Sequence, residues 1–175
     1  MLRVSIVTLF PELFAPFVAT SVAPLLKPLP SPRATLRLFL ETHMRNLAAN
    51  PWMPRLMARE VLSEGGSLRE HMQANFSVSL APKLFALIIA AQRRGEIRND
   101  LHPALIGLSL ISLAVFPFAA APVWHGVARS LFRGTDFELQ VEHLQRNAPG
   151  PDALIEHTLA LIDSALEKPH AKPKR

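Results

Sequence analysis

The seven histidines are the side chains best suited to bind a metal ion, but their spacing does not favour it. Two histidines four residues apart on a helix would present their ring nitrogens on one face, as a zinc site requires. No pair has that spacing; the histidines are His43, His71, His102, His125, His143, His157 and His170. The chain has no cysteine, which also excludes thiolate ligands. We therefore expect no metal.

Motifs for catalysis are also missing from the sequence. There is no Gly-x-Ser-x-Gly nucleophile turn and no glycine-rich phosphate loop. Glu138 and Glu142 are spaced i, i+4, but such carboxylate pairs are common on solvated helix faces. We predict that the protein is not an enzyme and needs no cofactor.

The composition indicates one globular helical domain. Hydrophobic residues make up 49% of the 175 residues and charged residues 19%, while glycines number only seven. The net charge is +5, but four cations lie in residues 168–175 without an acid, which predicts a disordered basic tail rather than a nucleic-acid surface. The lack of cysteine and of a secretory signal pattern favours a cytoplasmic location.

Apolar residues recur every three or four positions in several segments, which predicts an all-α fold. Residues 1–10 could form a short strand or the start of a helix. The expected helices cover 11–27, 33–49, 51–64, 67–94, 103–124 and 151–167. Ser31 and Pro32 have the residue types preferred at a helix start, and Gly95 has the type preferred just after a helix end.

Residues 103–124 contain no charged residue and are long enough to span a bilayer. Pro117, Pro122 and Gly107 argue against a membrane span, as does the absence of a Trp/Tyr belt at both ends, since only one end carries a tryptophan, Trp124. We predict no membrane association, and instead a helix buried on nearly all sides, partly in the core and partly in a subunit interface.

Several stretches resemble the effector-binding and dimerisation half of TetR-type transcriptional regulators. These are Pro51-Trp52 through Arg59-Glu60, the turn Gly95-x-Ile97-Arg98-x-Asp100-Leu101-x-Pro103, Phe116-Pro117-Phe118, and the closing helix from Asp152 to Leu166. The resemblance implies a multi-helix C-terminal ligand-binding domain that forms a homodimer through a four-helix bundle.

From this resemblance we predict two sites. A cavity for a small apolar or amphipathic effector would be lined by Phe39, Met57, Phe76, Phe85 and Phe116, with Trp124 closing one end. These large side chains could equally be ordinary core. The predicted dimer interface comprises Leu110, Leu113, Leu154, Thr158, Leu161, Ile162 and Ala165.

The first ten residues do not match the helix-turn-helix module that precedes this domain in the family. We therefore expect residues 1–10 to be an atypical start, 11–167 the effector-binding and dimerisation domain, and 168–175 a tail. Residues 6–14 also resemble the opening strand of bacterial tRNA guanine methyltransferases. DNA would be reached only through an N-terminal module that we do not find in this chain. A truncated interaction module that heterodimerises with full-length relatives is the alternative function.

Overall fold

The computed structural model describes residues 6–59, 80–131 and 151–167, with side chains for 15–59, 80–120 and 151–167. These ranges contain helices and no strand, so the all-α prediction is confirmed. The helices are α1 (Ile6–Leu26), α2 (Pro32–Ala49), α3 (Trp52–Met57), α5 (Ala81–Arg93), α6 (Pro103–Leu131) and α8 (Pro151–Leu166).

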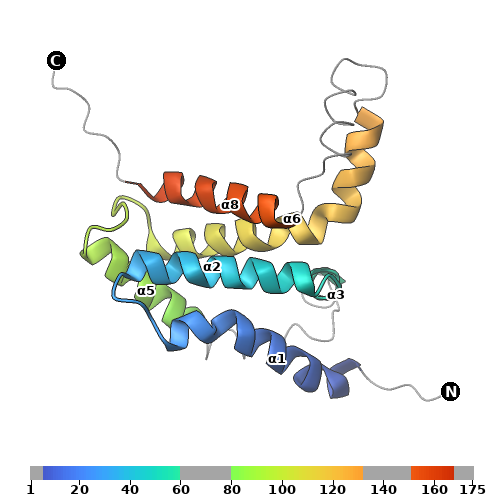
Figure 1. Cartoon of the computed structure of the whole chain (residues 1–175), viewed down its shortest axis with the longest axis horizontal. Coiled ribbons are helices and arrows are strands. Elements are labelled where there is room, and N and C mark those ends of the chain that lie inside the picture. Colours follow the sequence, from blue (N-terminus) through green and yellow to red (C-terminus); the bar gives the residue numbers. More distant parts are fainter. Residues whose placement is uncertain (1–5, 60–79, 132–150, 168–175) are drawn as a thin grey trace.

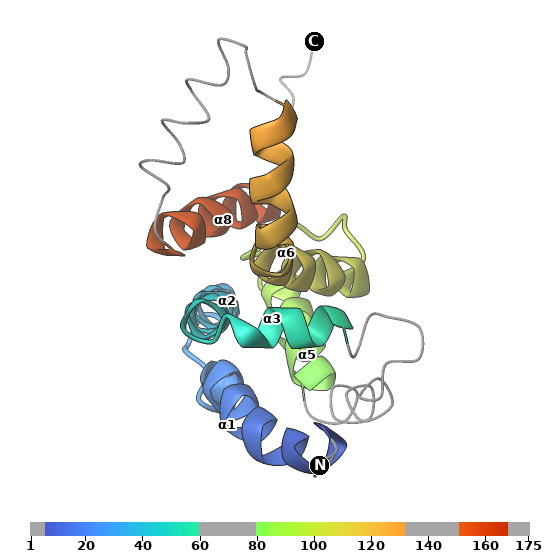
Figure 2. The same cartoon turned by 90° about the vertical axis from the view of Figure 1, so that its right-hand side faces the viewer.

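Helix α2 is the centre of the arrangement. It packs against α1 on one side and against α5, α6 and α8 on the others (Figures 1 and 2). Helix α8 lies along the first half of α6, whereas the second half of α6 turns away from the bundle (Figure 1). Helix α6 contains Pro117 and Pro122, and proline is a usual cause of a sharp bend in a helix.

Two clusters of buried side chains hold the helices together. The main core cluster joins α2, α5, α6 and α8 with the turn before α6, and a smaller cluster joins α1, α2 and α3. The main cluster includes Leu36, Phe39, Leu40, Met44, Leu84, Ile88, Ile97, Ile106, Leu110, Ile155, Leu159 and Ile162, and the smaller one Phe17, Leu47 and Met53. The half-buried side chain of Phe118 touches both clusters.

Several observed boundaries differ from the expected ones. Helix α1 begins at Ile6 and continues through Pro16 and Pro24, so residues 6–10 are helical rather than strand. Helix α6 extends beyond the predicted end at residue 124 to Leu131. Residues 67–79 of the long expected helix 67–94, and residues 60–64, lie outside the described part of the chain.

The N-terminus of α2 is closed by side chains from two parts of the chain. Ser31 is the N-cap: its Oγ accepts a hydrogen bond from Ala34 N at 3.1 Å and donates one to Glu96 Oε2 at 2.7 Å. Arg33 N donates to the same Glu96 oxygen at 2.8 Å. Pro32 has no N–H to satisfy, so the first turn of α2 leaves no donor unpaired.

Two other helix ends meet at the same place. Helix α5 ends in a Schellman motif: Gly95, at φ 67°, donates to Gln92 O, and Glu96 N donates to Ala91 O. Arg98 N then donates to Leu166 O at 2.9 Å at the end of α8, and Arg33 Nη2 reaches Asp163 O of α8 at 3.3 Å. We call Ser31, Arg33, Glu96, Arg98 and Leu166 the helix-end junction, since they connect the ends of α2, α5 and α8.

Replacing Ser31 with Ala removes both hydrogen bonds of the cap. Losing an N-cap side chain typically costs about 1 kcal/mol, or roughly 2–4 °C in Tm for a domain of this size. Thermal unfolding followed by circular dichroism measures this. Ser164→Ala, at an exposed position on α8, is the control and should leave Tm unchanged.

Glu96→Gln should lower stability at neutral pH and flatten its dependence on acid. Hydrogen bonds from Arg33 N and from the Ser31 hydroxyl lower the pKa of the Glu96 carboxyl below its usual 4.5. The stability that the charged Glu96 carboxylate contributes is therefore fully present above about pH 4.5, and it is lost as the pH falls through the lower pKa of Glu96 in the folded protein. Urea unfolding between pH 3 and 7 tests this, with the exposed Glu156→Gln as control. Equal acid dependence in both variants would contradict the prediction.

Candidate dimerisation and ligand-binding surfaces

Helix α6 has one buried face and one exposed face, both apolar. Ile106, Gly107, Leu110 and Ala114 are buried against the bundle. The opposite side carries Leu105, Leu108 and Phe116, whose side chains are 62%, 64% and 69% exposed. Because large exposed apolar patches are uncommon on monomers, this face is a candidate interaction surface.

A shallow apolar groove runs between α6 and α8 beside this exposed face. Its volume is about 240 Å³. It is lined by Leu101, His102, Leu105, Ile106, Ser109, Leu110, Leu113, Ile162, Ala165 and Leu166. The His102 ring faces the start of α6, where its Nδ1 accepts a hydrogen bond from Ala104 N at 3.2 Å. We call these ten residues the α6–α8 groove.

The predicted dimer residues fall into two groups. Leu110, Thr158 and Ile162 are buried within the single chain, while Leu154 is half-buried. Leu113 and Leu161 are 42% and 51% exposed, and Ala165 is also exposed. The α6–α8 groove brings Leu110, Leu113, Ile162 and Ala165 together, and it does not include Leu154, Thr158 or Leu161.

Sequence reasoning did not select the two most exposed leucines of this surface. Leu105 and Leu108 lie in or next to the groove and were not among the predicted interface residues. Their spacing of three residues places them on one helical face, which was the available signal. It was not decisive, because an uncharged helix has no polar face from which to tell the buried side from the exposed one.

The predicted cavity residues are not gathered around one cavity in the described part of the chain. Phe39 is fully buried in the main core cluster, and Phe85 packs against that cluster. Met57 packs against the smaller cluster, and Phe116 is on the surface. Phe76 lies outside the described residues, as does the side chain of Trp124.

Phe85 of α5 packs against Gly107 of α6. A Cβ atom added to Gly107 would lie 2.8 Å from Phe85 Cε1 and 3.5 Å from Ile88 Cδ1. The missing side chain at Gly107 therefore lets the aromatic ring rest directly on the α6 backbone.

Phe39 stacks on a histidine that joins α2 to α1. The Phe39 and His43 rings are 6.0 Å apart at 14°, and Phe17 of α1 meets His43 edge-on at 5.9 Å. His43 Nδ1 lies 3.0 Å from Ser21 Oγ. Asn46 Nδ2 donates to Ser21 Oγ at 3.0 Å and to Phe17 O at 2.8 Å. These contacts form a polar network inside the α1–α2 interface.

This network accepts a neutral imidazole more readily than a charged one. Burial lowers the pKa of His43 from 6.5 to about 4. Ser21 Oγ already accepts a hydrogen bond from Asn46, so its own hydroxyl proton is free to bond to an unprotonated His43 Nδ1. Protonation would turn Nδ1 into a second donor and leave the Ser21 proton without its acceptor.

The described residues show neither a metal site nor a fully enclosed helix. No group of three or more His, Asp or Glu side chains is placed to hold a metal ion in this part of the chain. One described helix, α6, is long and apolar enough over Pro103–Ala120 to cross a membrane by length and composition, and 22% of that stretch is buried in the chain. The single chain thus covers only one face of the stretch that was expected to be buried on nearly all sides.

The described residues form an all-helical domain in which α6 presents an exposed apolar face. A family model described as the tetracyclin repressor-like C-terminal domain matches residues 32–142. Because this match covers more than half of the chain, the protein belongs to the TetR-like C-terminal domain family. None of the curated proteins compared with the chain matches it.

Gly107→Val should destabilise the protein by forcing Phe85 and Ile88 away from α6. Overpacking of this kind typically costs about 1–3 kcal/mol, more than the small helix propensity that a glycine replacement gains. Urea unfolding at fixed protein concentration measures the change. Ala104→Val, at an exposed position of the same helix, is the control. Equal stabilities of the two variants would contradict the close contact.

Stability should fall as the pH drops from about 6.5 toward 4 because unfolded His43 binds a proton that the folded protein excludes. The pKa difference between 6.5 and about 4 corresponds to about 3 kcal/mol, fully available above pH 6.5. His43→Phe keeps the ring stacking but cannot titrate, so its urea-unfolding stability should change less over this range. A chemical-shift titration of the His43 ring with a midpoint near 6.5 would disprove the prediction.

Proposed function

We propose that residues 11–167 form the ligand-sensing and dimerisation domain of a TetR-like transcriptional regulator, a non-catalytic protein of the cytoplasm. The observation that carries the proposal is the exposed apolar face of α6 and α8 on a chain of this family. A regulator of this class would bind DNA through a separate helix-turn-helix module and not through the domain described.

Dimerisation would cover the apolar face of α6 and α8. In a twofold dimer the same surface of each protomer meets its copy, so the α6–α8 groove would receive exposed side chains from the partner. Leu105, Leu108 and Leu113 are suited to this role because they are exposed and lie in or next to the groove. Helices α6 and α8 of two protomers would then form a four-helix bundle.

Regulation would require the effector to bind one helix arrangement more tightly than another, because a ligand shifts a conformational equilibrium only by its differential affinity. Two features support this. Phe85 rests on Gly107 at the α5–α6 contact, so ligand entry there would change the distance between these helices. Helix α1 is joined to α2 by the network around His43, so a movement of α2 would carry α1 with it.

Leu113→Glu should convert the dimer into a monomer by placing a charge in the α6–α8 groove. A buried polar group without a partner typically costs about 1–3 kcal/mol, and a charged one more, so a loss of about 2 kcal/mol or more predicts at least roughly a 30-fold weaker dimer. Sedimentation velocity at micromolar concentrations measures this. Leu29→Glu is the matched control, since Leu29 is 44% exposed, close to the 42% of Leu113, but lies between α1 and α2. A monomeric wild-type protein, or a dimer that tolerates Leu113→Glu, would overturn the proposed surface.

A further inference from the structure

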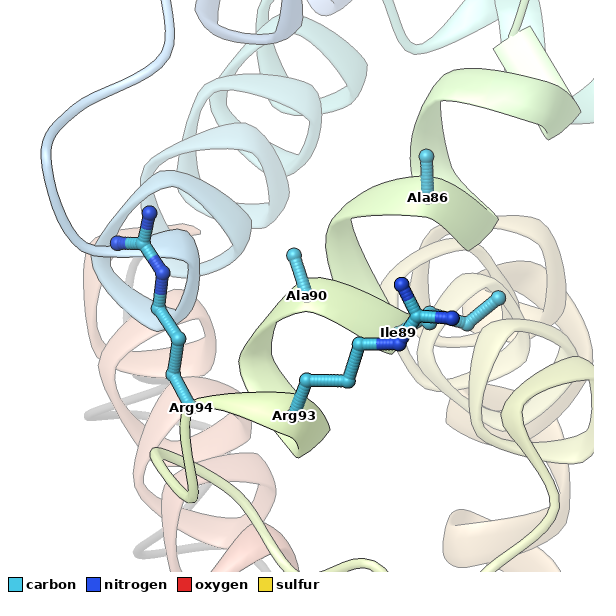
Figure 3. A pocket seen from close by; sticks show the side chains of 5 residues that line it. All are labelled: Ala86, Ile89, Ala90, Arg93 and Arg94. Carbon is cyan, nitrogen blue, oxygen red and sulfur yellow. The ribbon is translucent and has the colours of Figure 1, made fainter.

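The outer face of α5 carries a hollow that is separate from the α6–α8 groove. Its volume is about 420 Å³, and Figure 3 shows the side chains that line it: Ala86, Ile89, Ala90, Arg93 and Arg94. Arg93 extends toward the side of Ile89, and Arg94 extends to the opposite side of the two alanines (Figure 3). The hollow therefore has a small apolar floor between two cationic side chains. We call it the α5 hollow.

The two arginines of the α5 hollow differ in what they already bind. Arg94 Nη1 donates to Pro30 O at 2.6 Å and lies 3.9 Å from Glu96 Oε1, so its charge is compensated within the chain. Arg93 is exposed and makes no hydrogen bond or ion pair with the described residues. Among the described residues, no acidic side chain lines the hollow. One uncompensated cation thus remains beside the apolar floor.

The end of α5 does not oppose an anion as strongly as a bare helix C-terminus would. The last carbonyls of a helix usually present partial negative charge. Here Ala90 O, Ala91 O and Gln92 O accept hydrogen bonds from Arg94 N, Glu96 N and Gly95 N. Three carbonyls of the last turn of α5 are therefore already paired.

We propose that the α5 hollow binds a small anionic amphipathic molecule, with its carboxylate on Arg93 and its alkyl chain over Ala86, Ile89 and Ala90. Ala86 and Arg93 are seven positions apart, which corresponds to about 10 Å along the helix axis and suits a medium-length alkyl chain. The α5 hollow would match such a ligand in both charge and shape, because an apolar floor alone would not favour an acid over an uncharged molecule. This inference rests on the proposed ligand-sensing function and adds a binding site for a ligand of this class at the α5 hollow, apart from the α5–α6 contact.

Titration calorimetry with octanoate tests the proposal on the full chain, with octanol as the uncharged probe. We expect saturable binding of octanoate and weaker binding of octanol. Arg93→Gln should weaken octanoate binding about three- to fivefold, as expected of a partly exposed ion pair. Lys83→Gln removes the same charge from an exposed position of α5 outside the hollow and should leave the affinity unchanged.

Ala86→Leu provides a second test, because it fills the floor at an exposed helical position where a leucine is well tolerated. It should reduce octanoate binding while Tm stays unchanged. Octanoate binding that is insensitive to both Arg93→Gln and Ala86→Leu would overturn the α5 hollow, as would no binding at all. Sedimentation of the same samples distinguishes a failure of the α5 hollow from a failure of the proposed function. An intact dimer that does not bind octanoate would count against the proposed ligand class alone.

Discussion

The start of α2 depends on a carboxylate that comes 63 residues later in the chain. Glu96 accepts hydrogen bonds from Arg33 N and the Ser31 hydroxyl, and it does so because the Schellman turn at Gly95 sends the chain back across α2. Shortly after this turn, Arg98 N donates a hydrogen bond to Leu166 O at the end of α8. Backbone groups at the ends of three helices are thus satisfied at one point, which fixes the relative positions of α2, α5 and α8.

That fixed arrangement determines which face of α6 is left uncovered. With α2 and α5 in place, Ile106, Leu110 and Ala114 fill the main core cluster, and α8 covers only part of the remaining surface. Leu105 and Leu108 are then left exposed. Removing such leucines from water is favourable by roughly 25 cal/mol per Å² of apolar area. The uncovered face is therefore a consequence of how the core closes, and in the proposed dimer a second protomer would cover it.

Helix α1 is attached by a different kind of contact from the other helices. Its contact with α2 combines Phe17 with a buried polar network of Ser21, His43 and Asn46. Polar networks need defined geometry, since an unpaired buried group is costly, so they hold a helix in one orientation. In the proposed regulator, such an attachment would make α1 follow a movement of α2.

The sequence alone determined the helical class, most helix starts and the family, because these follow from local patterns. Ser31 and Pro32 start α2, Gly95 follows α5, and Pro103 and Pro151 start α6 and α8 as their residue types predict. Only the tertiary structure decided which side of each apolar helix is buried. In α6 the leucines at 105, 108, 110 and 113 are chemically alike, and their roles differ only through the position of α2, α5 and α8. The role of Glu96 could not be predicted from the sequence either, because a helix cap formed by a residue 63 positions away has no local sequence pattern.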